Sequence, residues 1–431
     1  MREKMDGHTI SSYYPALSWF ILFCGFMLVV LHRFITAGLQ DTFTHTFAMS
    51  ATGFAFLSSS YFYLYPLMQV PAGFALDIFG PRRIAIASFL IMTAGTILFA
   101  SASTFGGLFW GRVLISFGAS FIWGTLLKIQ GIFFPARLFA LLTGFGAVAG
   151  SFGIILAGSP FMAGVANFGW RETIYIIALG SFTLMLGSLL FIRPPSNISG
   201  RDSLYSANRS LKAELRGAGR VLTRKAGILL FFCHFGIYGT YAAFLGIWSY
   251  PFLAAEAGLT VNKASFMITW MGIGYMFGGP VLGHLSDRFG QKRKPVLLIT
   301  CGGLTLFMAS LMLLPLFKAN PVLLLYPALF WLGFFTPGLV LTMVLARELL
   351  DPSFSGVAVG VANSGGFVGA ALVQLAVGFI LDRGWQGDYI NGIMSYPWPV
   401  MQQVIVFSTF LLAVSFLSAY MVKEHKSGFE A

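Results

Sequence analysis

The chain has 431 residues, of which 57% are hydrophobic and 10% are charged. Soluble domains carry roughly 25% charged residues, so this composition excludes a chain whose whole surface faces water. The net charge is +12, but Lys and Arg lie in short gaps between apolar runs instead of along one soluble face, which excludes a nucleic-acid-binding domain.

The apolar runs predict an all-α polytopic membrane protein with twelve transmembrane helices, because a spanning helix needs about 20 apolar residues and a barrel strand would be shorter and alternating. The first run follows Arg2 and Lys4, as in a signal peptide, but it is too long for one and no cleavage site follows it. The predicted spans are 16–38, 50–75, 84–103, 107–130, 138–160, 173–193, 226–250, 262–283, 295–316, 321–346, 356–381 and 400–422.

Basic residues are distributed unequally between the two sets of gaps. One set contains both termini, the 193–225 and 288–294 segments, and single residues such as Arg137 and Arg347, whereas the other contains only Arg171, Lys263, Lys318 and Arg383. The positive-inside rule places the first set in the cytoplasm. We therefore expect a multi-pass protein of the bacterial inner membrane with both termini inside.

The longest polar stretch, 194–225, divides the chain into two halves, 1–193 and 226–431. It is rich in Arg and Lys, and Leu211, Leu215 and Val221 would suit an amphipathic helix on anionic lipid. A solvated linker held inside by its charge is the alternative. Both interpretations make this segment a cytoplasmic basic linker.

An internal repeat relates the two halves. Asp77 and Asp287 are 210 residues apart, and the same offset relates Arg137 to Arg347. A duplicated six-helix unit is common in secondary transporters, so we expect two pseudo-symmetric six-helix bundles. The repeat contains the candidate gating motif: Gly73, Asp77, Gly80, Arg82, Arg83, Arg137, Gly283, Asp287, Arg288, Gly290 and Arg347.

The paired Gly-x-x-x-Asp-x-x-Gly loops resemble the signature of the major facilitator superfamily. The resemblance implies two bundles around a central cavity that work by alternating access. Ile78 and Pro81 stand where basic residues are common in this motif. We hypothesise that Asp77 and Asp287 latch the outward-facing state by gripping the helices that follow Arg137 and Arg347; capping of the loops is the alternative.

Three cations lie deep in the predicted helices: Arg33, Arg112 and Lys128. Charge at membrane depth is costly and marks function by default. Since every acidic residue falls near a helix end or in a gap, an anionic substrate could supply the missing countercharge. Snorkelling to the membrane surface is the alternative for Lys128 and Arg33.

The first two helices resemble the organic-anion symporter branch of the superfamily, through Arg33 and the tyrosines Tyr61 and Tyr65, although His32 stands where that branch often has an acid. His32 and His234 are candidate proton sites or packing residues. The candidate substrate-binding residues are His32, Arg33, Tyr61, Tyr65, Arg112, Trp123, Lys128, His234, Tyr238, Tyr241, Asn363 and Gln374.

No phosphate-binding loop, zinc motif or nucleophile elbow occurs, so we expect neither an enzyme nor a bound cofactor or metal. The leading function is symport of a small carboxylate-like organic anion, driven by protons or another ion, by a monomer in the lipid bilayer. An exporter of drug-like or siderophore-like compounds and an amino-acid or nutrient carrier are the alternatives within transport. A channel or a membrane sensor is a more distant alternative.

Overall fold

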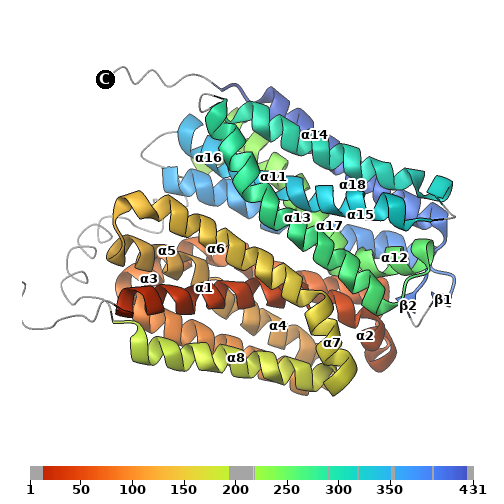
Figure 1. The fold of residues 1–431 in the computed structure, drawn as a ribbon, viewed down its shortest axis with the longest axis horizontal. Helices are drawn as coiled ribbons and strands as arrows, with labels where there is room; N and C mark the ends of the chain where they lie inside the picture. Colours follow the sequence, from red (N-terminus) through yellow and green to blue (C-terminus); the bar gives the residue numbers. More distant parts are fainter. Residues whose placement is uncertain are drawn as a thin grey trace, which may run out of the picture.

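The computed structural model describes residues 13–193, 217, 219–289, 292–317, 320–350, 355–390 and 393–424, and these residues are mainly helical (Figure 1). The first half contains α1 (Tyr13–Phe34), η1 (Ala37–Leu39), α2 (Gln40–Phe47), α3 (Ala51–Ser101), α4 (Phe105–Ala119), α5 (Ile122–Phe133), α6 (Ala136–Ala157), α7 (Ser159–Phe168) and α8 (Trp170–Phe191).

The second half begins with α11 (Lys225–Ala243), the π-helical turn η2 (Phe244–Trp248), α12 (Ser249–Ala257), α13 (Val261–Arg288), α14 (Lys294–Ser310) and η3 (Leu311–Phe317). It continues with α15 (Val322–Phe335), η4 (Thr336–Leu339), α16 (Val340–Leu349), α17 (Ser355–Gly384) and α18 (Trp398–Met421). Two short antiparallel strands, β1 (Tyr389–Ile390) and β2 (Ile393–Met394), form a hairpin between α17 and α18.

The twelve-helix fold is confirmed. Eleven segments of the described chain are long and apolar enough to cross a membrane, and the twelfth predicted span, 50–75, is the first part of α3. Gly80 divides α3 into two helical segments, because its φ of 77° lies in the left-handed region that glycine adopts without a steric penalty. The predicted helix 107–130 is also divided, into α4 and α5.

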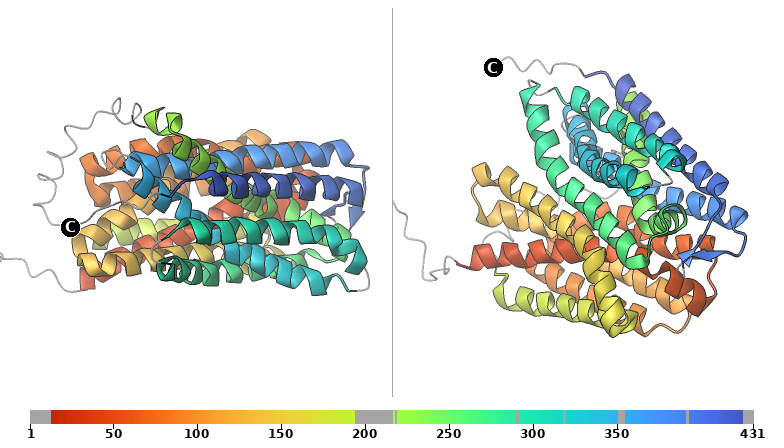
Figure 2. Two further views of the ribbon diagram at one scale, coloured as in Figure 1. Left: turned by 90° about the horizontal axis from the view of Figure 1, so that it is seen from above. Right: turned by 45° about the vertical axis from the view of Figure 1, so that its right-hand side comes forward.

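The two halves form two bundles that lie side by side (Figures 1 and 2). They meet along α6 with α13 and along α3 with α17. Small residues allow the close approach: a Cβ on Gly158, between α6 and α7, would lie 2.5 Å from the Thr269 hydroxyl of α13, and one on Gly378 of α17 would lie 2.5 Å from Ala55 of α3.

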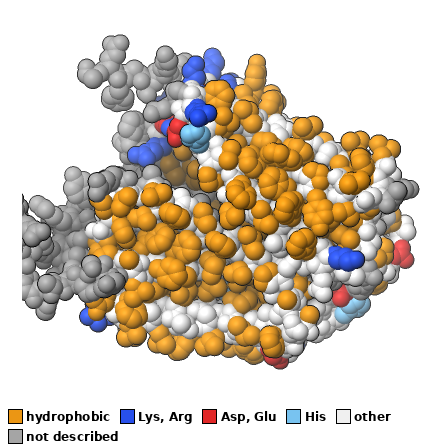
Figure 3. All heavy atoms as spheres, viewed as in Figure 1, with side chains coloured by type: hydrophobic (Ala, Val, Ile, Leu, Met, Phe, Trp, Pro, Cys, Tyr) orange, Lys and Arg blue, Asp and Glu red, His pale blue; other side chains and the backbone are white. Residues whose placement is uncertain are grey.

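Apolar side chains cover the length of the helices on the face shown in Figure 3, and its charged side chains lie mainly toward the two ends of the bundles. This distribution fits a lipid-facing surface. We call the end where α8 stops and α11 begins the linker end, and the opposite end, with β1 and β2, the hairpin end. The predicted 194–225 linker lies largely outside the described residues.

Candidate functional site: a central cavity

A cavity of about 200 Å³ lies between the two bundles and is lined by both. The first half contributes residues of α1, α3, α5 and α6, and the second half contributes residues of α11, α13, η4, α16 and α17. The lining residues are Phe26, Val30, Arg33, Phe34, Tyr65, Trp123, Gly150, Ile154, His234, Tyr238, Tyr241, Tyr275, Leu339, Val340, Met343, Asn363 and Phe367.

Arg33 is the one Arg or Lys among the described residues that line the cavity, and its side chain is 7% exposed. Its Nη1 donates a hydrogen bond to the Tyr238 hydroxyl at 3.3 Å. The guanidinium carbon lies 4.7 Å from the Tyr65 ring centroid and 5.4 Å from that of Phe367. These cation–π contacts hold the planar group between rings of both halves.

The described cavity lining contains no Asp or Glu. The described acidic residues lie near helix ends or in loops: Asp41, Asp77, Glu172, Glu256, Asp287, Glu348, Asp382, Asp388 and Glu424. Arg33 therefore lies in the cavity without a carboxylate beside it among these residues, and its Nε has no hydrogen-bond partner. A cation in this setting is a ready partner for an anion.

The wall formed by the first half is aromatic. The rings of Phe26 and Trp123 lie 4.6 Å apart between centroids. Both rest on glycines of α6, because a Cβ on Gly146 would lie 2.9 Å from the Trp123 ring and one on Gly150 would lie 3.4 Å from Phe26. The glycines of α6 thus make room for the aromatic wall as well as for helix packing.

Tyrosines form the opposite wall. The Tyr238 and Tyr241 ring centroids are 6.4 Å apart, and those of Tyr241 and Tyr275 are 5.8 Å apart. His234 lies next to them and its Nδ1 is 2.6 Å from the Thr342 hydroxyl. Gly366 of α17 makes room for this histidine, since a Cβ there would lie 2.3 Å from its ring.

Arg112, a predicted substrate contact, does not line the cavity. Its side chain is buried and donates to three backbone carbonyl oxygens, those of His32 at 3.2 Å, Leu57 at 3.1 Å and Ser58 at 3.0 Å. It thereby joins α4 to α1 and α3. The buried guanidinium is satisfied by the protein itself, so the geometry assigns it a structural place within the first bundle.

His32 and Tyr61 also lie behind the cavity wall. His32 is buried with its Nε2 3.4 Å from the Thr96 hydroxyl, and Tyr61 donates to the Val29 carbonyl at 3.2 Å. The Tyr61 ring still supports Arg33, whose guanidinium carbon is 5.8 Å from its centroid. Tyr61 thus supports Arg33 from the side away from the cavity.

Gln374 and Lys128 are the other predicted contacts that the cavity lining lacks. Gln374 is buried near Gly246 of η2, and its amide has no hydrogen-bond partner among the described residues. The Lys128 Nζ lies 2.7 Å from Asp77 Oδ1 at the linker end. On a straight helix Arg112 and Lys128 would point about 160° apart, so at most one of them could face the cavity, and neither lines it in the structure.

The two gating-motif aspartates pair within their own halves. Asp77 pairs with Lys128, whereas Asp287 Oδ1 lies 2.9 Å from Arg293 Nη1. Arg293 Nε also reaches Glu348 at 3.4 Å. Burial opposes the charge of Arg293, but the hydrogen bonds to Asp287 and Glu348 outweigh that effect and raise its pKa.

The remaining motif residues are exposed or support loops. Arg82 donates to the Leu189 carbonyl at 2.8 Å, and Arg83, Arg288 and Arg347 are exposed. An added Cβ on Gly73 or Gly283 would meet nothing within 4 Å. The side chain of Arg137 and all of Gly290 lie outside the described residues.

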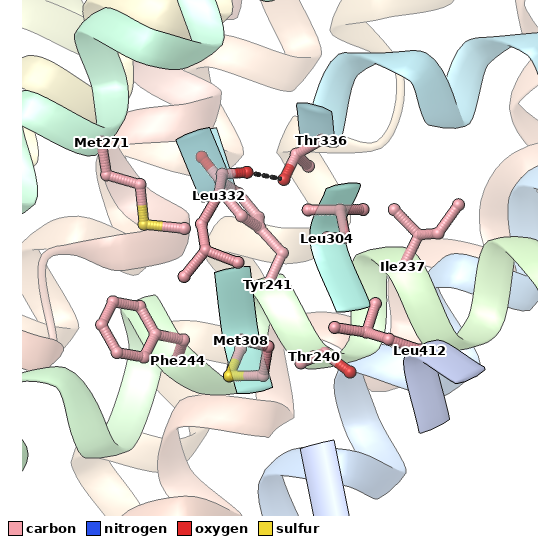
Figure 4. A pocket seen from close by; sticks show the side chains of 10 residues that line it. All are labelled: Ile237, Thr240, Tyr241, Phe244, Met271, Leu304, Met308, Leu332, Thr336 and Leu412. Carbon is pink, nitrogen blue, oxygen red and sulfur yellow. Dashed lines mark hydrogen bonds between the residues drawn. The ribbon is translucent and has the colours of Figure 1, made fainter. Parts of the chain in front are cut away.

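A much smaller pocket, of about 10 Å³, lies inside the second bundle (Figure 4). Tyr241 lines both this pocket and the central cavity. The other residues that line this pocket are mainly apolar. The Thr336 hydroxyl already donates a hydrogen bond to the Leu332 carbonyl at 2.7 Å. This pocket is a gap in the packing of one bundle, and it lies apart from Arg33.

Comparison with known proteins agrees with this architecture. The family model described as Major Facilitator Superfamily matches residues 21–250 and 230–430. The chain belongs to the Major Facilitator Superfamily. Members named in the comparisons below are transporters, so the chain is a membrane transporter that acts on a small molecule.

Two curated relatives cover most of the chain. An uncharacterised MFS-type transporter, YceJ, of Bacillus subtilis (strain 168) is 25% identical over 368 residues, which cover 83% of this chain and 88% of the relative. A galacturonate transporter of Dickeya chrysanthemi is 24% identical over 320 residues, which cover 69% of this chain and 89% of the relative.

Solved structures share the fold. The nucleoside transporter NupG superposes with a TM-score of 0.70 at 15% identity, covering 95% of this chain and 100% of that chain. A bacterial homolog of the human lysosomal transporter Spinster, in an inward-facing and occupied conformation, gives a TM-score of 0.71 at 15% identity, covering 95% of this chain and 97% of that chain.

Sequence reasoning missed several lining residues, notably Phe26, Tyr275, Met343 and Phe367. Phe367 lies one helical turn after the predicted Asn363, so the same α17 face could have identified it. Tyr275 is an aromatic residue within the glycine-rich α13, between Gly274 and Gly278. Neither Phe26 nor Met343 differs in sequence pattern from residues that face lipid.

Proposed function

We propose that this chain is a secondary transporter that moves a small organic anion with a carboxylate group across the membrane by alternating access. Arg33 carries the proposal. It lies in the central cavity with no acidic side chain among the described lining residues. Removing an ion from water costs roughly several kcal/mol unless an opposite charge compensates, and a carboxylate substrate would supply that charge.

The surroundings of Arg33 suit a carboxylate. The Tyr65 and Phe367 rings hold the guanidinium group, and a guanidinium edge presents parallel N–H donors to a planar anion. Arg33 also donates to Tyr238 of the other half. A substrate that competes for this donor would act on a contact between the halves, which is how binding can influence alternating access.

Two polar contacts between the halves lie at the hairpin end. Thr44 contacts Met394 across the halves at 3.6 Å, and the Ser159 backbone N–H donates to Thr269 at 3.3 Å. At the linker end, the ion pairs of Asp77 and Asp287 each remain within one half. We infer a state that is closed at the hairpin end and open at the linker end.

The charge distribution supports placing the linker end in the cytoplasm, so this state is inward-facing and both termini lie inside, in a bacterial inner membrane. Here the latch formed by Asp77 and Asp287 is released. We propose import coupled to protons, with His234 as the better-placed proton site, because it lines the cavity and His32 does not. The galacturonate transporter supports an anionic substrate, since galacturonate is a carboxylate.

The test is binding and counterflow with purified protein in proteoliposomes, using radiolabelled benzoate, galacturonate, citrate, uridine and alanine. We expect a carboxylate to bind and exchange, Arg33→Ala to abolish its binding, and Arg33→Lys to lose most of the affinity because the fork geometry is lost. Lys263→Ala, an exposed cation at the hairpin end, is the control. Arg33-independent binding, or selective exchange of uridine or alanine, would overturn the proposal.

A further inference from the structure

The walls of the central cavity are built mainly from aromatic rings. Phe26 and Trp123 form a pair on one side, and Tyr238, Tyr241 and Tyr275 form a row on the other. The two sets come from different halves of the chain. A flat apolar group placed between them would meet ring faces and edges on both sides, an arrangement that favours aromatic partners.

The polar side chains of the described cavity lining are Arg33, His234, Asn363 and four tyrosines, and several of them already have partners. Asn363 is the one side-chain amide among the described lining residues. The Tyr238 hydroxyl accepts from Arg33, and His234 Nδ1 is engaged with Thr342. Each hydroxyl of a polyhydroxylated acid would need a partner here, because burying an unpaired hydroxyl costs roughly 1–3 kcal/mol.

The charge of the cavity lining also limits how many carboxylates the substrate can carry. Arg33 is the one Arg or Lys among the described lining residues. It can neutralise one carboxylate, and a second or third carboxylate on the same molecule would be left without a cation in a low-dielectric cavity. The lining therefore matches a single negative charge on an apolar body.

We propose that the substrate is an aromatic monocarboxylate, whose carboxylate pairs with Arg33 and whose ring lies between the Phe26–Trp123 pair and the tyrosine row. This inference rests on the proposed organic-anion transport and narrows it to a chemical class. Trp123 is the residue that sets the preference for a ring. Gly146 leaves room for the Trp123 ring, since a Cβ at this position would lie 2.9 Å from that ring.

Scintillation-proximity binding to purified full-length protein tests the class with benzoate, galacturonate, citrate and acetate. Benzoate is expected to bind at least tenfold more tightly than galacturonate or citrate. Trp123→Ala should weaken benzoate about tenfold, with acetate changed less than twofold, and Trp123→Phe should restore most of the benzoate affinity. Trp110→Ala is the matched control, since Trp110 is 60% exposed outside the cavity.

The outcomes separate the two proposals. If galacturonate or citrate binds more tightly than benzoate and Arg33→Ala abolishes that binding, the aromatic class is overturned and anion transport stands. If Trp123→Ala leaves Arg33-dependent benzoate binding unchanged, the aromatic class is likewise overturned. If no carboxylate of the set binds in an Arg33-dependent manner, both proposals fall. Arg33→Gln, checked for a monodisperse elution profile, replaces Arg33→Ala if the latter does not fold.

Discussion

The carboxylate of Asp382, in α17 of the second half, accepts a hydrogen bond at 2.6 Å from the backbone N–H of Ala51, the first residue of α3 in the first half. Its other oxygen accepts from the Thr52 N–H at 2.8 Å. The first N–H groups of a helix have no partner within the helix and carry partial positive charge. Asp382 thus fastens the two halves at the hairpin end.

Neutralising this contact should loosen the hairpin end. Asp382→Asn removes the charge and one acceptor oxygen, at a cost of about 1–2 kcal/mol, so the ratio of closed to open hairpin ends should fall roughly fivefold to thirtyfold. Electron-spin distance measurements between labels at Asn167 and Gln386 should show a larger long-distance population. Asp388→Asn, an exposed carboxylate near the same end, should leave the distribution unchanged. An unchanged distribution in Asp382→Asn would disprove the fastening role.

We expect the ion pair with Lys128 to limit how readily Asp77 can form the latch that would close the linker end. The two groups are 2.7 Å apart, but the Asp77 side chain is 44% exposed, so the pair contributes no more than about 1 kcal/mol. Lys128→Met should free Asp77 and shift the protein toward closure at the linker end, whereas Asp77→Asn should shift it the other way. Labelling of single cysteines that line the cavity would report both shifts. Movement of both variants in the same direction would refute the latch.

Most of the fold could be predicted because long apolar runs must form helices in lipid, and the Asp77 and Asp287 loops identify the repeat. Helix ends were less predictable where glycine or tertiary contacts decide them, as at Gly80 and between α4 and α5. The sequence shows where a charge lies along a helix. It does not show which backbone carbonyls of other helices will meet that charge.

This limit explains the different outcomes for the two deep arginines. Both were predicted to contact the substrate; Arg33 lines the cavity, whereas Arg112 does not, because carbonyls of α1 and α3 hold its side chain. The aromatic walls were also hard to foresee, since the chain contains 46 Phe and 15 Tyr residues and many of them face lipid or core. Trp123 was predicted, whereas its partner Phe26 was not.

Arg112 should matter for stability more than for binding. Arg112→Gln removes donors to three buried carbonyls, which should destabilise the first bundle by about 2–4 kcal/mol. Arg112→Lys should recover only part of this loss, because a single ammonium group cannot span α1 and α3 with the same geometry. The readout is the midpoint of thermal aggregation in detergent, with carboxylate affinity measured on the folded fraction. A tenfold loss of carboxylate affinity without a lower midpoint of thermal aggregation would show instead that Arg112 contributes to substrate binding.

We expect His234 to take up a proton when substrate binds. The Thr342 hydroxyl donates its proton to the Leu339 carbonyl at 2.7 Å, so it accepts from Nδ1–H of His234 at 2.6 Å. In the neutral ring, Nε2 is then the free acceptor. Arg33 and His234 line the same cavity, so an anion that binds Arg33 shares that space with His234.

The negative charge of a carboxylate bound there would favour the protonated form of His234, so anion binding and proton uptake should favour each other. Carboxylate affinity should therefore rise as pH falls, and His234→Gln should flatten the dependence while retaining binding through Arg33. His32→Gln is the matched control, because His32 is buried behind the wall beside Thr96. The measurement is the carboxylate affinity of each variant between pH 5 and pH 8, expressed at each pH as a ratio to the wild-type affinity. An unchanged pH profile in His234→Gln, or a flattened one in His32→Gln, would show that coupling does not run through His234.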